Sequence, residues 1–290
     1  MSLNRRRFLT IAAAFAATPA MAARHSWRGR AFGAEIGIEV HGPAALAEPA
    51  LAAARQRIVE VERMFSLFDP GSDLVRLNRD RRIAPRPQFL ALMQAADRAY
   101  HLTGGLFDPT VQPLWAALAR GEDPGAAEVL IGWDRVRFNS QEVRLAPGQA
   151  LTFNGIAQGF ATDLVSEELA ARGVTKTLVN IGEHRGLGGP WRLGLSDPRH
   201  GALGALSLTS GAVATSSPQA TPLGDKGHIL HQQAAPKWSS VTVEAETATQ
   251  ADALSTALVL APFEQVRELR RAAGLRRVIL VDPAGDLITV

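Results

Sequence analysis

The sequence predicts an α+β fold, with mixed, largely antiparallel sheets and helices packed against them. Predicted strands cluster along the chain and hairpins outnumber clean strand–helix–strand units, which is typical of this class. The 290 residues are 46% hydrophobic and 20% charged, so the chain can bury a sizeable core in one large domain or two closely joined ones. No internal repeat of about 20 to 50 residues is present, which excludes solenoids and propellers.

The first half of the chain is expected to contain a strand at about residues 31–40 and then two helices. The first helix follows Gly42-Pro43 and is ended by the break at residues 69–72. Its apolar residues recur at helical spacing and are expected to face the core: Leu51, Ile58, Val61, Phe65 and Phe68. The second helix begins at Pro87, because proline is tolerated in a first helical turn, and ends at Gly104-Gly105.

A loop-rich region at residues 121–148 separates this half from the second. The second half is expected to open with a helix at residues 159–172, which Gly173 ends, and a strand at residues 174–179. The remaining predicted elements are strands at 191–195, 205–208, 211–214 and 239–243, helices at 251–260 and 263–273, and a hairpin of 278–281 with 287–290.

Residues 1–22 are typical of a twin-arginine export signal. Residues 4–10, Asn-Arg-Arg-Arg-Phe-Leu-Thr, precede a short apolar run and the small-x-small sequence Ala20-Met21-Ala22. An amphipathic first helix is the alternative, but the run is too short to span a bilayer and too rich in alanine to anchor a core. We expect cleavage after Ala22, a single domain over residues 23–290, and a periplasmic protein without a membrane anchor.

Charge and cysteine content exclude several kinds of partner and chemistry. Three of the 31 basic residues lie in the leader, which contains no acid, so 28 basic residues balance the 28 acidic ones in the rest of the chain. A nucleic-acid-binding domain is expected to keep a basic excess, so no nucleic-acid partner is expected. The absence of cysteine excludes disulfides, thiolate metal sites and cysteine nucleophiles, so any metal must be held by oxygen or imidazole.

The first candidate site is the segment at residues 154–159, Asn-Gly-Ile-Ala-Gln-Gly, which opens a predicted helix. Its two glycines allow a close backbone approach to a ligand, and the free amides of a helix start suit a phosphate. The segment lacks the Lys-Ser/Thr pair of a Walker loop and the third glycine of a dinucleotide fingerprint. A purely structural helix entry therefore remains the alternative.

The second candidate is the pair Asp252 and Thr256, which lie four residues apart on one face of a small, apolar helix. A carboxylate in such surroundings needs a partner. In a structural interpretation, Asp252 caps the helix start and Thr256 bonds back to a carbonyl. In a functional one, the pair and a loop carbonyl hold a hard cation whose other ligands are phosphate and water, as magnesium prefers.

The third candidate is His228, three residues before His231. A zinc site is disfavoured because two glutamines follow and no acid lies nearby. General-base duty for one of the two imidazoles is the functional alternative.

Together with residues 65–78 and 104–111, these segments resemble the ApbE family, the FAD:protein FMN transferases. The resemblance runs from about residue 32 to residue 260. Its motifs occur in a specific order: S-x-(aromatic)-x-P-x-S-x-L-x-x-L-N, G-x-F-D-P-T-V, G-I-A-x-G-(aromatic)-A-x-D, Asn-x-Gly, Ala-Thr-Ser, His-Ile and A-D-A-L-x-T. It implies an ApbE-like or T-fold-like α+β fold. It also implies an enzyme that cuts FAD at its pyrophosphate, joins FMN to a Thr or Ser hydroxyl of a partner flavoprotein and releases AMP.

The resemblance also implies roles for particular residues. It places a magnesium site on Asp252, Thr256 and the backbone carbonyl of Gly155, and the base that takes the acceptor's proton on His228. It places the FAD contacts on Phe32, Phe68, Leu106, Phe107, Asp108, Thr152, Gln158 and Ile229. Such a site suits phosphoryl transfer, where a protein mainly positions the groups and a cation neutralises developing charge.

The chain departs from the family's pattern at four places. Thr152 stands where an acid is common, Gln158 where lysine is common, residues 180–184 read Asn-Ile-Gly-Glu-His instead of Asn-x-Gly-Gly-Asp, and His231-Gln232 replaces Asp-Pro. The sequences Asn-Gly-Ile-Ala-Gln-Gly at residues 154–159 and Gly-Glu-His-Arg at residues 182–185 resemble the branch of the family associated with nitrous oxide reductase maturation. The expected function is magnesium-dependent FMN transfer to a periplasm-facing flavoprotein. The alternatives are a non-catalytic flavin-binding accessory protein and an FAD pyrophosphate hydrolase.

Overall fold

The computed structural model describes residues 23–223 and 226–290. The expected export signal at residues 1–22 lies outside the described residues. Within the described part of the chain, no helix is long and apolar enough to cross a membrane.

The described residues form a main sheet of eight strands, and every neighbouring pair in it is antiparallel. In spatial order the strands are β1 (Arg24–Ala31), β2 (Ala34–His41), β6 (Thr177–Asn180), β7 (His184–Leu187), β10 (Gly211–Ser216), β13 (Ser240–Ala245), β14 (Arg277–Val281) and β15 (Leu287–Thr289). The smaller sheets pair β8 (Trp191–Asp197) with β9 (Gly201–Leu208), β5 (Val143–Arg144) with β3 (Arg82–Ile83) and β4 (Arg137–Phe138), and β11 (Pro222–Leu223) with β12 (Lys226–Gly227).

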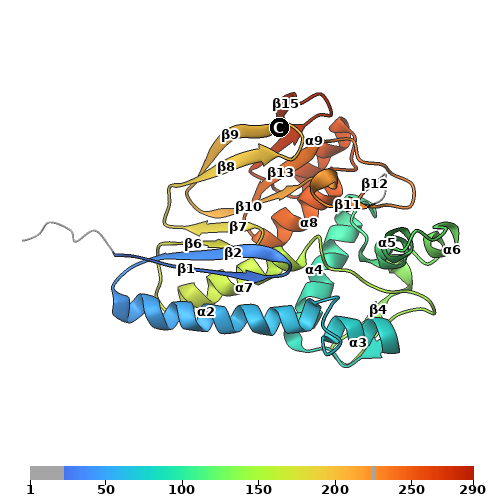
Figure 1. Ribbon diagram of the computed structural model, residues 1–290, viewed down its shortest axis with the longest axis horizontal. Helices are drawn as coiled ribbons and strands as arrows, with labels where there is room; N and C mark the ends of the chain where they lie inside the picture. Colours follow the sequence, from blue (N-terminus) through green and yellow to red (C-terminus); the bar gives the residue numbers. More distant parts are fainter. Residues whose placement is uncertain (1–22, 224–225) are drawn as a thin grey trace, which may run out of the picture.

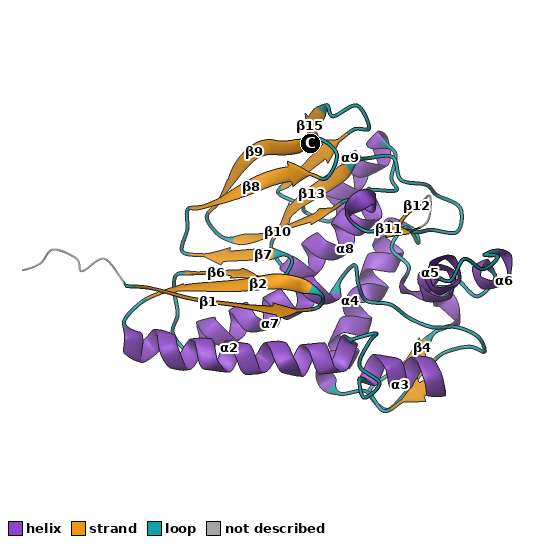
Figure 2. Ribbon diagram, in the orientation of Figure 1, coloured by secondary structure: helices purple, strands orange, loops and turns teal. Residues whose placement is uncertain are grey.

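Helices cover one face of the main sheet (Figures 1 and 2). The α-helices are α2 (Ala44–Phe65), α3 (Asp73–Asp80), α4 (Pro87–Thr103), α5 (Gln112–Ala119), α6 (Gly125–Glu128), α7 (Ala157–Ala171), α8 (Ala248–Leu258) and α9 (Phe263–Ala272). The short 3-10 helices are η2 (Pro109–Val111), η3 (Trp133–Arg135) and η4 (Pro218–Ala220). The α+β class with largely antiparallel sheets is therefore confirmed.

The two faces of the sheet are buried by different partners because side chains alternate along a strand. Helices α2 and α7 pack on the half formed by β1, β2, β6 and β7, and α8 packs on β10 and β13. The hairpin of β8 and β9 covers the other face, where its apolar side chains meet Val213 of β10 and Ile279 of β14. Helices α7 and α8 also pack on each other, and both contain buried polar residues, among them Asp163 and Asp252.

Several expected elements are confirmed and others are wrong. Pro87 opens α4, and Gly104 ends it in the left-handed conformation (φ 63°). The strand expected at residues 31–40 is instead a hairpin whose tight turn, Phe32-Gly33, has positive φ at both residues. Strand β1 was not predicted because its arginines interrupt the apolar pattern on which the prediction relied. Helix α3, helix α5 and strand β7 have no counterpart among the predicted elements.

The expectation that Phe68 lies on the buried face of the first helix is wrong. Helix α2 ends at Phe65, and Phe68 is 88% exposed. The hydroxyl of Ser66 accepts the backbone N–H groups of Phe68 and Asp69, at 3.1 Å each, so a local turn replaces the next turn of helix.

Candidate active site

A cavity of about 590 Å³ is lined by all twelve residues to which the sequence assigned a catalytic, flavin-binding or metal-binding role. The hairpin turn of β1 and β2, the end of α2, the starts of η2 and α7, and α8 all contribute to its wall. The predicted site residues along it are Phe32, Phe68, Leu106, Phe107, Asp108, Thr152, Gly155, Gln158, His228, Ile229, Asp252 and Thr256. Segments more than 200 residues apart in the chain therefore meet in one place.

Asp252 projects from α8 in a buried position, with 3% of its surface exposed. Its Oδ2 accepts the backbone N–H of Gly159 at 2.9 Å. Burial raises the pKa of the Asp252 carboxyl to about 7, since the charged form loses its hydration. The structural interpretation of Asp252 as a helix cap is wrong, because the side chain of Thr247 caps α8 by accepting the N–H of Gln250.

Thr256 lies one helical turn after Asp252, against the backbone of Gly155. A Cβ atom on Gly155 would lie 2.8 Å from Thr256 Oγ1, so a larger residue would push the loop away from α8. The Thr256 hydroxyl lies 3.2 Å from the Ser216 hydroxyl, and among the described residues it makes no bond back to a carbonyl of its own helix. The carboxylate, the hydroxyl and the backbone of residue 155 are thus held together.

This donor set fits a magnesium ion. Magnesium takes oxygen ligands and commonly keeps water and substrate phosphate in its shell, so one or two carboxylates from the protein suffice. Among residues 23–223 and 226–290, no three His, Cys, Asp or Glu side chains gather as a metal-binding group. The oxygen donors of Asp252, Thr256 and Gly155 suit a cation that is shared with substrate phosphates.

Gly159, the second glycine of the segment at residues 154–159, has a structural role instead of the expected role in binding a ligand. Gly159 does not line the cavity, and its N–H is bonded to Asp252 instead of being free for a phosphate. A Cβ atom there would lie 2.3 Å from the carbonyl oxygen of Ala248, so this glycine lets α7 cross α8 closely. Gly155 and Gln158 of the same segment do line the cavity.

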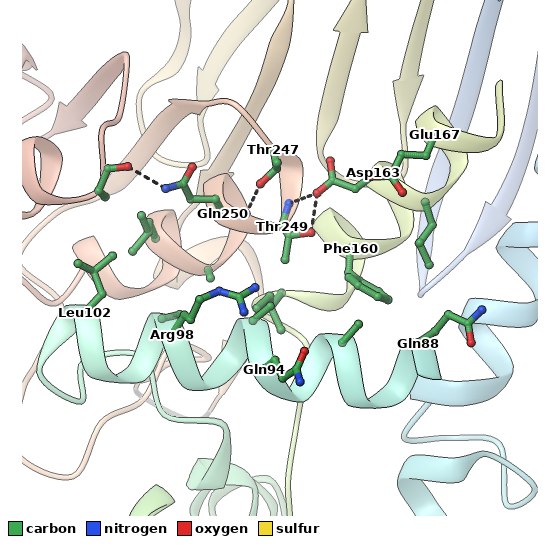
Figure 3. A pocket seen from close by; sticks show the side chains of 18 of the residues that line it. Gln88, Gln94, Arg98, Leu102, Phe160, Asp163, Glu167, Thr247, Thr249 and Gln250 are labelled. Carbon is green, nitrogen blue, oxygen red and sulfur yellow. Dashed lines mark hydrogen bonds between the residues drawn. The ribbon is translucent and has the colours of Figure 1, made fainter. Parts of the chain in front are cut away.

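A second clamp joins α7 to α8 one turn further along. Asp163 accepts the backbone N–H, at 2.8 Å, and the hydroxyl of Thr249 (Figure 3). It also accepts the backbone N–H of Ala248 at 2.8 Å. Its Oδ1 also receives the Arg185 guanidinium at 2.7 Å. Asp163 thus satisfies amides at the start of α8 that have no partner within the helix. It belongs to the G-I-A-x-G-(aromatic)-A-x-D motif, but its partners could not be predicted from that motif.

A larger cavity, of about 810 Å³, lies on the other side of α7 and α8 (Figure 3). Its walls are α4, with Gln94, Arg98 and Leu102, and the faces of α7 and α8 that carry Phe160 and Thr249. None of the site residues expected from the sequence lines it. The smaller cavity is therefore the candidate active site.

Glu183 is a carboxylate of the candidate site to which the sequence assigned no role. It follows β6, lines the cavity and is 8% exposed. Its Oε2 accepts the backbone N–H of Thr215 at 3.2 Å. Burial, together with the nearby charge of Asp252, raises the pKa of the Glu183 carboxyl well above its ordinary value.

His228 is anchored through one ring nitrogen. Its Nδ1 and its backbone N–H both lie 3.1 Å from the carbonyl oxygen of Pro218 in η4. A carbonyl only accepts, so Nδ1 carries the hydrogen, and the neutral ring presents the lone pair of Nε2. His231 is not part of the cavity wall, and its Nδ1 accepts the N–H groups of Gln233 and Ala234. The structure therefore separates the two histidines that the sequence left open.

Comparison with known proteins supports the family that the motifs indicated. The family model described as "ApbE family" matches residues 32–279. The chain belongs to the ApbE family. It is 27% identical to the FAD:protein FMN transferase of Rhodobacter capsulatus over 290 residues, which cover 88% of this chain and 55% of that protein. The chain thus spans little more than half the length of that relative.

The alignment with this chain covers a larger share of two further similar proteins. The FAD:protein FMN transferase of Escherichia coli K12 is 23% identical over 261 residues, covering 78% of this chain and 74% of that protein. The crystal structure of the Pseudomonas stutzeri flavinyl transferase ApbE, apo form, is similar with a TM-score of 0.79 and 25% identity, covering 93% of this chain and 95% of that one. The expectation of an ApbE-like fold is confirmed.

Proposed function

We propose that this ApbE-family chain is a magnesium-dependent FMN transferase that moves FMN from FAD to a Thr or Ser hydroxyl of a partner flavoprotein and releases AMP. The observation that carries the proposal is the convergence of the twelve expected site residues, from residue 32 to residue 256, on one cavity. Residues assigned to the cation, the flavin and the proton transfer line one cavity, which supports their acting on one substrate.

In the proposed reaction, the acceptor hydroxyl attacks the phosphorus on the FMN side of the FAD pyrophosphate. The new P–O bond forms as the bond to the AMP oxygen breaks, and the hydroxyl proton passes to Nε2 of His228. The hydrogen bond from His228 to the Pro218 carbonyl keeps this nitrogen free and orients the ring. The same bond stabilises the imidazolium that forms.

The cation site is assigned to Asp252, Thr256 and the carbonyl of Gly155. A bound magnesium ion would neutralise charge that develops on the pyrophosphate oxygens. Asp252 has one carboxylate oxygen available for a cation, because its only hydrogen-bond partner among the described residues, the N–H of Gly159, is bonded to the other oxygen. The crossing of α7 and α8 holds that oxygen in place, which fixes the direction of the other.

The flavin is assigned to the wall that carries the aromatic and apolar side chains. Phe68 is exposed at the cavity although it is large and apolar, which is expected of a side chain that packs against a planar ligand. Phe32 is held in its turn by a hydrogen bond from its N–H to Glu62 at 2.8 Å. Asp108 caps η2 by accepting the N–H of Thr110, and burial raises the pKa of its carboxyl.

The acceptor is proposed to face the periplasm, because the leader at residues 1–22 is typical of twin-arginine export. That route carries folded proteins, which suits an enzyme whose site is assembled from distant segments. The chemistry of the acceptor is a Thr or Ser hydroxyl on a flavoprotein.

The proposal is tested by incubating the purified protein with FAD, magnesium and a peptide that contains an acceptor threonine. We expect a peptide mass increased by FMN and an equal amount of AMP, with no product from a control peptide in which valine replaces the threonine. FAD bound tightly without AMP release would instead support the accessory protein. AMP formed equally with either peptide would support the hydrolase.

A further inference from the structure

Glu183 and Asp252 are two buried carboxylates on the wall of one cavity, and the proposed reaction uses one of them. Both side chains are more than nine-tenths buried. Among the described residues, no Lys, Arg or His forms an ion pair with either carboxylate. The Arg185 guanidinium, two residues after Glu183, is occupied by Asp163.

The backbone around Glu183 is held firmly, so its carboxylate has a defined position. The preceding residue, Gly182, has a φ of 88°, and a Cβ there would lie 2.6 Å from the side chain of Gln158. The carbonyl of Glu183 accepts the hydroxyl of Thr162 at 3.3 Å, and its Oε2 accepts the N–H of Thr215. Among the described residues, Oε1 has no partner, and it belongs to a side chain that lines the cavity.

Buried carboxylates without a counter-charge are costly, because each loses its hydration and each repels the other. A single hydrogen bond from a backbone amide compensates only part of this cost on Glu183. A divalent cation between the two groups would offset the desolvation penalty and screen the repulsion. The unused oxygens of Glu183 and Asp252 are of the hard type that magnesium and manganese prefer.

We propose that Glu183 is a second anionic ligand of the divalent cation, which it contacts directly or through one bound water, together with Asp252. This inference rests on the cation site of the proposed function and adds a residue to it. The site then supplies two negative charges to the cation. Glu183 is held at the start of β7 and by its bond to Thr215 of β10, and Asp252 is held by α8, which packs on β10.

The inference is tested by titrating the purified protein with Mn²⁺ or Mg²⁺ alone, without FAD, in a calorimeter. Glu183→Gln keeps the shape and the bond to Thr215 but removes the charge, and it should weaken the affinity for the cation about 10–100-fold. Asp252→Asn should weaken it at least as much. Glu264→Gln, on the exposed surface of α9, is the matched control and should bind as the unchanged protein does.

Thermal unfolding supplies a second measurement that does not depend on turnover. In EDTA, Glu183→Gln should melt at a higher temperature than the unchanged protein, because glutamine can be buried without carrying a charge and without taking up a proton. The rise in melting temperature on adding Mg²⁺ should be smaller in this variant than in the unchanged protein. Glu183→Asp, which keeps the charge, should recover part of the cation affinity.

The outcomes separate this inference from the proposed function. If Asp252→Asn loses cation binding while Glu183→Gln binds as tightly as the unchanged protein, Glu183 is no ligand, although the magnesium site stands. If the unchanged protein binds neither cation, both the inference and the proposed magnesium site are overturned. If both variants lose affinity and the control does not, the two-carboxylate site is supported.

Discussion

Replacing Gly159 by alanine would place a methyl group where α7 crosses α8. The added Cβ would lie 2.3 Å from the Ala248 carbonyl oxygen and 2.7 Å from Cβ of Asp252, where ordinary contacts are 3.4–4 Å. The two helices must therefore separate by about 1 Å. This movement stretches the bond from the Gly159 amide to Asp252 and carries the proposed cation ligand away from its position.

The change in the free energy of unfolding caused by Gly159→Ala is the sum of opposing contributions. Alanine favours a helix over glycine by about 1 kcal/mol, whereas overpacking costs about 1–3 kcal/mol. Weakening a hydrogen bond to a buried carboxylate costs a further ~1.5 kcal/mol or more. We expect a net destabilisation of about 2 kcal/mol, which lowers the melting temperature by roughly 3–4 °C in a domain of this size.

The assay is thermal and urea unfolding followed by far-UV circular dichroism, alongside Mg²⁺ titration of the folded variant. Gly194→Ala in β8 is the control, because a Cβ there meets nothing within 4 Å. It should leave stability and cation affinity unchanged or raise stability slightly. The reasoning is refuted if Gly159→Ala is as stable as the unchanged protein and binds Mg²⁺ equally well.

The other predictions concern the proposed base, the buried carboxylate and export. His228→Ala should lower the rate about 10²–10⁴-fold with little change in FAD affinity, and His231→Ala should cost much less; a proportional loss of FAD binding would make His228 a binding group instead. Because the pKa of Asp252 rises from 3.8 to about 7 on folding, the metal-free folded state binds more protons than the unfolded state between these values. Its stability should therefore fall as the pH rises from about 4 to about 7, on the order of 4 kcal/mol at most, and Asp252→Asn, compared by urea unfolding, should flatten this dependence; equal pH profiles would contradict it. Replacing Arg5 and Arg6 by lysine should leave uncleaved precursor in the cytoplasm, as checked by fractionation, and an unchanged periplasmic yield would rule out twin-arginine export.

Local signals determined much of the secondary structure. Pro87 and Gly104 delimit α4 as expected, because a first-turn proline and a left-handed glycine act within a few residues of themselves. The end of α2 was misplaced because the Ser66 hydroxyl, rather than the break at residues 69–72, turns the chain. A serine that accepts backbone amides has no signature in the apolar pattern.

The sequence by itself determined which residue types are available for chemistry, the order of the family motifs and the approximate bounds of α4, α7 and α9, since all of these lie along the chain. Only the tertiary structure decided what each group faces. Gly159 belongs to a segment that looks like a phosphate-binding loop, but it permits the close crossing of α7 and α8. The Nδ1 of His228 is bonded to the Pro218 carbonyl, and this contact could not be predicted from the sequence. Glu183 and Asp252, which are 69 positions apart, share a cavity because the turn between β6 and β7 and a helix packed on the main sheet converge there. Contacts between residues so far apart in the sequence depend on how whole helices and sheets pack, and no local sequence pattern encodes them.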